Sequence, residues 1–199
     1  MTNQLKIIVG LGNPGEQFKG TRHNAGFEIL NAFLLAIRSS GTEVNEINAK
    51  KHNCKLYSLS SPKAVFAYPQ SYMNLSGQPV KSLLDWYKIL DLKNLLIVHD
   101  DVALPIGKIR WTHSSGAGGQ HGVESIIQHL GGRKDFVRLR FGIGPDPGGE
   151  YRSSFVLSKF RPEEENLFNL AKDRSLESLE LFLHGADLQN LMNSFNGLP

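Results

Sequence analysis

The stretch KIIVGLGNPGEQFKGTRHNAGFEILNAFLLAIR, residues 6–38, joins a strand, a glycine-rich turn and a helix. Lys6–Gly10 is a short apolar run that ends in glycine, which is typical of a buried strand. Gly26–Arg38 follows with apolar side chains at helical spacing, on Phe27, Leu30, Phe33, Leu34 and Ile37. A strand followed at once by a helix is the repeating unit of an α/β protein.

The same alternation continues along the chain. Further strands are predicted at Asn53–Leu59, Ala64–Tyr68, Asn94–His99, Lys108–Thr112 and Asp135–Gly144. Further helices are predicted from Ser76 to Ile89, over Gly122–Leu130, from Pro162 to Gly185 and over Leu188–Phe195. A flexible loop is predicted at Ser114–Gly119 and a mobile stretch at Pro145–Arg152. We therefore predict one α/β domain over residues 1–199, with a mixed, mostly parallel twisted sheet and helices on both faces.

Composition narrows the class of protein. The 199 residues are 40% hydrophobic and 21% charged, which is ordinary for a globular domain. No apolar run approaches the ~20 residues that span a bilayer, and the N-terminus does not resemble a signal peptide. Cys54 is the only cysteine, which excludes an intrachain disulfide and a multi-cysteine metal site. These features predict a cytosolic or organelle-interior protein with no membrane partner, and of the two locations we expect the cytoplasm.

Charge is distributed unevenly. The net charge of +3 conceals a central segment, residues 107–161, with 9 Lys/Arg against 4 Asp/Glu. Residues 162–199 have 2 Lys/Arg against 7 Asp/Glu, so this segment is acidic. A basic segment attracts phosphates, because lysine and arginine release counterions from a nucleic acid. It is also compatible with an ordinary solvated surface, so charge alone leaves both interpretations open.

The motif Gly10-Leu11-Gly12-Asn13-Pro14-Gly15 formally matches the dinucleotide fingerprint G-x-G-x-x-G. That fingerprint also requires an acidic residue about 20 positions later, at the end of a second strand. Here the region is occupied by the first predicted helix, and Pro14 removes a backbone donor. The glycines therefore indicate either a tight structural turn or a cradle where backbone amides approach a substrate.

His23 follows this turn, and Asp100 and Asp101 follow an apolar strand. Imidazole titrates near neutral pH, so His23 can act as a general base, although a capping or packing role is also compatible with its position. One of the two aspartates can orient His23, because a carboxylate at a strand end can accept from one imidazole nitrogen and leave the other nitrogen free as the base. The other aspartate would be a turn residue. His99 alternates with apolar residues and is predicted to be packed. The two aspartates and His99 could also form a metal site, but no matching pair of ligands elsewhere in the sequence would complete it.

Asn74 lies one turn before a predicted helix, within Pro69–Gly77. It is either a capping or turn residue, or a donor to a substrate carbonyl group. Tyr72 and Met73 would then form an apolar wall, although core packing explains them equally well.

Five segments together resemble the bacterial-type peptidyl-tRNA hydrolases. They are GLGNPG (10–15), TRHNAGF (21–27), SYMNLSG (71–77), HDD..LP.G (99–107) and LGGRKDFVRLRFGIG (130–144). The resemblance implies hydrolysis of the ester between a peptide and the 3′-terminal ribose of tRNA, without metal or organic cofactor, by a monomer. It implies His23 as the base and Asp100 as the residue that aligns it. It also implies substrate contacts from Asn13, Phe18, Tyr72, Asn74 and His121, and a tRNA contact from Arg140, to which we add Arg110 as a further expected tRNA contact.

Two positions depart from the family pattern. The family usually reads G-G-H-N-G where this chain has Gly118-Gly119-Gln120-His121-Gly122, so a substrate-holding asparagine is replaced by His121. The lysine of the family's clamp for the tRNA 5′-phosphate is replaced by Thr112, with Arg110 or His113 as candidate substitutes. These departures leave open an alternative function, a non-catalytic RNA-binding protein similar to the plastid factor for group II intron splicing.

Overall fold

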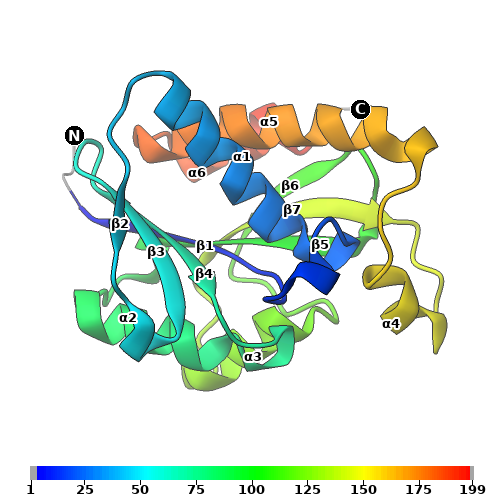
Figure 1. Cartoon of the computed structure of the whole chain (residues 1–199), viewed down its shortest axis with the longest axis horizontal. Coiled ribbons are helices and arrows are strands. Elements are labelled where there is room, and N and C mark those ends of the chain that lie inside the picture. The colour runs from blue at the N-terminus through cyan, green and yellow to red at the C-terminus, as the bar shows by residue number, and fades with distance from the viewer. Residues whose placement is uncertain (1–3, 198–199) are drawn as a thin grey trace.

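Seven strands form one mixed sheet in the computed structural model, which describes residues 4–197 (Figure 1). The strands are β1 (Lys6–Gly10), β2 (Asn45–Ile47), β3 (Cys54–Leu59), β4 (Ala64–Pro69), β5 (Leu95–Pro105), β6 (Ile109–His113) and β7 (Val137–Gly144). Their order across the sheet is β2-β3-β4-β1-β5-β7-β6. Strands β4, β1, β5 and β7 run parallel, whereas β2, β3 and β6 join the sheet by antiparallel pairs.

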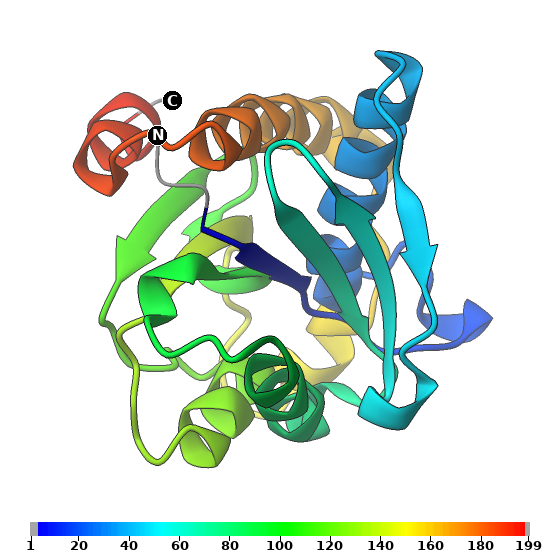
Figure 2. The ribbon, with the colours of Figure 1, turned by 90° about the vertical axis from the view of Figure 1, so that its left-hand side faces the viewer.

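Helices cover both faces of this sheet. They are α1 (Ala25–Ser39), α2 (Gly77–Tyr87), α3 (His121–His129), α4 (Tyr151–Val156), α5 (Glu165–Leu183) and α6 (Leu188–Phe195). Helices α1, α5 and α6 lie on one face and α2 and α3 on the other, as Figures 1 and 2 show from two directions. The short α4 lies beyond the end of the sheet. The predicted single α/β domain, with a mixed, mostly parallel sheet and helices on both faces, is thus confirmed.

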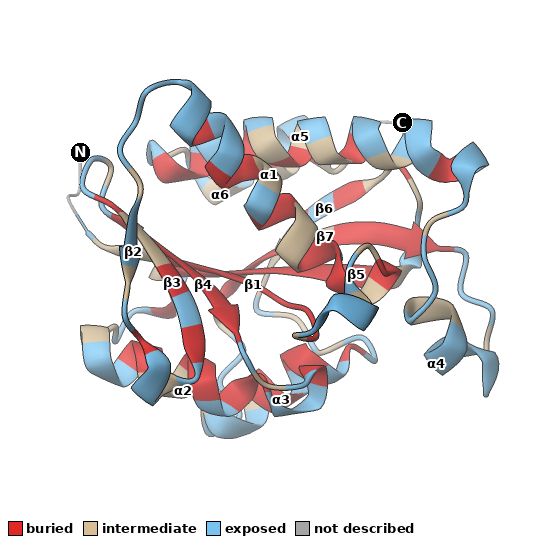
Figure 3. Cartoon of the chain, viewed as in Figure 1, coloured by how far each residue is buried: buried red, intermediate tan, exposed pale blue. Residues whose placement is uncertain are grey.

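The alternation of side chains along the central strands builds two cores. Ile8 of β1 faces Phe33 of α1, while its neighbour Ile7 faces the opposite layer with Leu83 of α2. All four side chains are at most 2% exposed, and most residues of the central strands are buried (Figure 3). Each such aliphatic or aromatic side chain contributes roughly 1.5–3 kcal/mol by leaving water. The sheet is therefore a rigid base for the loops at its edge.

Two elements were missed by the sequence analysis. Strand β2 is three residues long at the sheet edge, and it lacks the apolar alternation that marks a strand. Helix α4 begins inside the stretch predicted to be mobile, and its six residues include none that are buried. Strand β5 also continues six residues beyond the predicted end at His99, because it pairs with β7 up to Pro105.

The ends of three parallel strands meet at one point on the sheet edge. Strand β1 lies between β4 and β5, and the chain leaves β1 for α1 on one face and β4 for α2 on the other. Such a reversal opens a crevice beyond the strand ends. Gly26 lets α1 start directly over β5, since a Cβ there would lie 2.3 Å from the Val98 carbonyl oxygen. The turn that contains His23 is thereby brought onto Asp100.

Candidate active site

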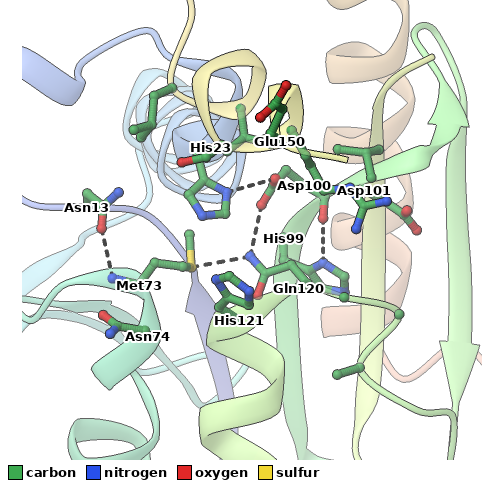
Figure 4. Close-up of a pocket in the computed structure, with 18 of the residues that line it drawn as sticks. Asn13, His23, Met73, Asn74, His99, Asp100, Asp101, Gln120, His121 and Glu150 are labelled. Carbon is green, nitrogen blue, oxygen red and sulfur yellow. Dashed lines mark hydrogen bonds and ion pairs between the residues drawn. The ribbon is translucent and has the colours of Figure 1, made fainter. Parts of the chain in front are cut away.

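A cavity of about 520 Å³ opens at these strand ends (Figure 4). It is lined by Asn13, His23, Met73, Asn74, His99, Asp100, Asp101, Val102, residues 117–121, Gly149, Glu150, Arg152, Ser153, Val156 and Leu157. Five predicted site residues, Asn13, His23, Asn74, Asp100 and His121, therefore share one cavity although they come from five separate segments of the chain.

His23 and Asp100 form a hydrogen-bonded pair in the cavity wall. His23 lies in a short 3-10 turn, η2 (Arg22–Asn24), and its Nδ1 is 2.8 Å from Asp100 Oδ2. The two side chains are 12% and 3% exposed. A carboxylate can only accept, so Nδ1 carries the proton of the neutral ring and Nε2 keeps its lone pair. This is the tautomer that can take a proton from water.

The surroundings of His23 favour its protonation. Burial alone would lower the pKa of the imidazole, but the charge of Asp100 and the hydrogen bond to it outweigh burial, and the pKa lies above its ordinary value of 6.5. A raised pKa increases the basicity of Nε2. It also means that the ring is a working base only above that pKa.

Asn13 is fixed with its amide nitrogen available to the cavity. The backbone N–H of Asn13 donates to Asn24 Oδ1 at 2.8 Å, and Asn24 Nδ2 donates to the backbone carbonyl oxygen of Asn13 at 3.0 Å. Its own Oδ1 accepts from the backbone N–H of Met73 at 2.7 Å, which orients the amide. The Nδ2 group is thus left as a donor toward a ligand. Asn24 was missed by the sequence analysis, which treated it only as part of a motif.

The other polar groups at the end of β5 have separate partners. Asp101 accepts from the backbone N–H of Ala103 at 2.9 Å and forms an ion pair with Arg140. His99 is 2% exposed, as predicted for a packed residue, and its Nδ1 donates to the Asp100 carbonyl oxygen at 2.7 Å. Burial lowers the pKa of His99 to about 4, so its ring is neutral. Among residues 4–197, no group of three His, Cys, Asp or Glu side chains is arranged to hold a metal ion.

The two arginines predicted to contact tRNA are direct neighbours across the sheet. Arg110 of β6 pairs in register with Arg140 of β7, and Thr112 pairs with Arg138. Residues directly opposite in an antiparallel pair point to the same face. Arg110 is exposed, whereas the Arg140 side chain is 22% exposed beside Asp101. Phe18 and Tyr72 are outside the cavity lining and pack edge to face, with ring centroids 6.2 Å apart.

Arg138 organises a wall of the cavity that the sequence analysis described only as a flexible loop. Its guanidinium donates to the carbonyl oxygens of Gly116 and Ser115, the former at 2.6 Å. Arg138 is 2% exposed and lies over the Phe136 ring, and burial lowers its pKa to about 10, so it stays charged at neutral pH. Residues 117–119, which continue from this anchor, line the cavity.

Arg22, next to His23, connects the η2 turn to the segment that follows α4. Its guanidinium lies 4.5 Å from the Phe155 ring centroid and 2.6 Å from Glu164 Oε2. Its backbone N–H donates to the Ser158 carbonyl oxygen at 2.9 Å. One buried side chain therefore holds both the histidine turn and the end of α4, whose Arg152, Ser153 and Val156 line the cavity.

Comparison with known proteins places this site in a family. A family model described as peptidyl-tRNA hydrolase matches residues 7–199. The chain belongs to the peptidyl-tRNA hydrolase family. It is 39% identical over 195 residues to the peptidyl-tRNA hydrolase of Halalkalibacterium halodurans, covering 96% of this chain and all of that one. It is 42% identical over 177 residues to the chloroplastic peptidyl-tRNA hydrolase of Arabidopsis thaliana, covering 89% of this chain and 60% of that one.

Solved structures of the family have the same fold. The crystal structure of peptidyl-tRNA hydrolase from Acinetobacter baumannii aligns with a TM-score of 0.87 at 32% identity, covering 99% of this chain and 96% of that one. The resemblance inferred from the sequence is therefore confirmed, and so is the prediction of an ester-hydrolase class of enzyme. Among residues 4–197, no helix is both long enough and apolar enough to cross a membrane.

Proposed function

We propose that this chain hydrolyses the ester between the C-terminal carboxyl group of a peptide and the 3′-terminal ribose of tRNA. Its membership of the peptidyl-tRNA hydrolase family supports the substrate class. The observation that carries the mechanism is the 2.8 Å hydrogen bond between His23 Nδ1 and Asp100 Oδ2, at the wall of an open cavity.

In the proposed reaction His23 Nε2 takes a proton from a water molecule, and the resulting hydroxide attacks the ester carbonyl carbon. Asp100 holds the ring and stabilises the imidazolium, which returns its proton to the ribose oxygen as the ester bond breaks. General-base assistance of this kind is worth roughly 10²–10⁴-fold. Asn13 Nδ2, fixed by Met73, donates to the developing oxyanion, which adds about 3 kcal/mol.

The test is cleavage of an N-blocked aminoacyl-tRNA by the purified protein. His23→Ala is expected to lower kcat by about 10²–10⁴-fold, because the base is removed. His184→Ala is the control, since His184 is an exposed histidine at the end of α5. Cleavage by His23→Ala at the wild-type rate would refute the mechanism. Tight tRNA binding by the wild type without cleavage would instead favour the non-catalytic RNA-binding function.

On the RNA side, we propose that Arg110 and Arg140 contact phosphates of the tRNA. Their register across β6 and β7 presents two guanidinium groups on one face of the sheet. Arg110 thus supplies a second cation beside the arginine of the family clamp, although the lysine position holds Thr112. The ion pair with Asp101 orients Arg140, whose side chain is 22% exposed.

Arg140→Ala is expected to weaken tRNA binding and to reduce the slope of log K against log salt by about 1, because one phosphate contact is lost. The measurement is a salt titration of tRNA affinity. Arg38→Ala, which removes an exposed arginine on α1, is the matched control. If Arg140→Ala and Arg38→Ala give the same salt slope, Arg140 does not contact the RNA.

Contacts of Phe18, Tyr72, Asn74 and His121 with the peptidyl end remain predictions, as do the monomeric state and the cytoplasmic location. Asn74 and His121 line the cavity below His23 in the view of Figure 4, where a bound acyl group would pass between them. Tyr72 directly precedes Met73, which lines the cavity, and Phe18 packs against the Tyr72 ring.

A further inference from the structure

Gln120 is in contact with the His23–Asp100 pair although it belongs to a different element. It is the N-cap residue of α3 and is 7% exposed. Its Oε1 accepts from the backbone N–H of Val123 at 2.9 Å. Its Nε2 donates to Asp100 Oδ1 at 2.9 Å and lies 3.2 Å from the Met73 sulfur (Figure 4).

These contacts fix the direction of the Gln120 amide. The N–H of Val123 can only donate, so it requires the amide oxygen, and the amide nitrogen must then face Asp100. Glutamine is not among the preferred N-cap residues, since shorter side chains cap a helix at lower entropic cost. The longer side chain does what a serine or asparagine cap would not do, because it also reaches the carboxylate at the end of β5.

We propose that Gln120 is a positioning residue that holds the plane of the Asp100 carboxylate, so that one oxygen stays aligned with His23 Nδ1 and the imidazole keeps the orientation in which Nε2 accepts a proton from water. Within residues 4–197, the Asp100 carboxylate receives side-chain hydrogen bonds from His23 and Gln120, one on each oxygen. The inference depends on the hydrolytic mechanism proposed above, in which Nε2 is the base.

Other charged groups around Gln120 have their own partners or lie across the cavity. The charged ones are Asp101 on β5, Arg140 on β7, and Glu150 and Arg152 on the far wall, and the imidazole rings of His99 and His121 also lie there. Asp101 is paired with Arg140, and Arg152 with Asp146. The neutral amide of Gln120 does not titrate, so the orientation that it imposes on Asp100 is independent of pH.

An exchange of carboxylate and amide between the two positions tests this role. In Asp100→Asn, Gln120 Nε2 still requires an oxygen, so the introduced amide must turn its nitrogen toward His23, and the ring proton moves to Nε2. In the double variant Asp100→Asn/Gln120→Glu, the carboxylate at position 120 accepts from that nitrogen instead. The amide oxygen then faces His23 Nδ1, and the original tautomer is restored.

The double variant is expected to have a kcat at least about tenfold above that of Asp100→Asn, because the two positions are energetically coupled. Asp100→Asn/Gln128→Glu is the control, since it adds the same carboxylate at an exposed position of α3 and should give no rescue. A double variant no more active than Asp100→Asn, or an equal rescue by the control, would overturn the inference.

Nitrogen-15 NMR of the imidazole gives a second readout that does not depend on turnover. The ring proton is expected on Nδ1 in the wild type, on Nε2 in Asp100→Asn and again on Nδ1 in the double variant. An unchanged proton position across the three proteins would contradict the role of Gln120. If the wild type cleaves no ester, only the proposed function is refuted. The NMR experiment would still show whether the position of the ring proton depends on residue 120.

If the double variant does not give a native circular dichroism spectrum, Gln120→Met replaces it. Methionine keeps the length of the side chain but has neither the amide donor nor the oxygen acceptor. It is expected to lower kcat at unchanged tRNA affinity, because the Asp100 carboxylate is then held on one oxygen only, while the ring proton stays on Nδ1. A wild-type kcat in this variant would overturn the inference too.

Discussion

Asp100→Asn is expected to lower kcat by about 10⁴-fold, the loss known for the equivalent change in a serine-protease triad, where the imidazole is held in the wrong tautomer. The two side chains have nearly the same size, so the cavity and its contacts with tRNA should be preserved. The measurement is kcat together with tRNA affinity. Equal losses of both would show that Asp100 supports binding rather than the orientation of His23.

The pH profile separates the electrostatic role of Asp100 from its geometric role. The base works only when neutral, so in the wild type kcat/KM should rise with pH through a pKa above 6.5 and then level off. Without the negative charge of Asp100, burial is left to lower the pKa of His23, and the residual activity of Asp100→Asn should rise at lower pH. If the activity of Asp100→Asn rises over the same pH range as that of the wild type, this account of the pair is wrong.

Arg22→Met is expected to lower the free energy of unfolding by about 3 kcal/mol, at the lower end of the range for breaking a buried ion pair. The Arg22 side chain is 2% exposed and the Glu164 side chain 10%, so the substitution would leave the Glu164 carboxylate buried without the positive charge of Arg22. The loss is limited because Glu164 still accepts from the backbone N–H of Arg161 at 2.7 Å. Urea denaturation measures the change.

The pH dependence of stability identifies the group responsible. Burial raises the pKa of Glu164, but hydrogen bonds from the Arg161 backbone and from the Arg22 and Arg161 side chains lower it on balance. A lowered folded-state pKa stabilises the fold above the unfolded value and loses that contribution as pH falls. Arg22→Met removes part of this contribution, so the difference in stability between the variant and the wild type should shrink as pH falls through the folded-state pKa. Arg161→Ala, at a side chain 65% exposed, should stay close to wild type in urea; a midpoint shift equal to that of Arg22→Met would contradict the buried pair as the cause.

The sequence predicted the parts of the fold that follow from local pattern. Continuous apolar runs located the central strands. Helical spacing located α1, and residues typical of a helix start and stop located α5, both to within a few residues. The meeting of His23 with Asp100 was also predictable, because parallel strand ends share one edge of a sheet. Elements without an apolar pattern, such as β2 and α4, were not predictable, since tertiary contacts at the edge of the sheet hold them in place.

The supporting residues of the site were harder to predict than the pair itself. Gln120 reaches Asp100 only because α3 begins beside the end of β5, and no spacing in the sequence expresses that proximity. Asn24 and Arg22 fix the backbone and the turn through partners 11 and 142 residues away. The sequence indicated which groups could do chemistry, but their orientation depends on contacts that exist only in three dimensions.

The side of the sheet on which Arg110 and Arg140 point has a consequence for association with a polyanion. Their strand neighbours Trp111 and Leu139 are buried under α5 and α6, so the two guanidinium groups lie on the opposite face. The segment that forms those helices has 7 acidic residues against 2 basic ones. The two faces of the sheet at this end therefore differ in charge, and we expect this difference to turn an approaching phosphate chain toward the arginine face before any contact forms.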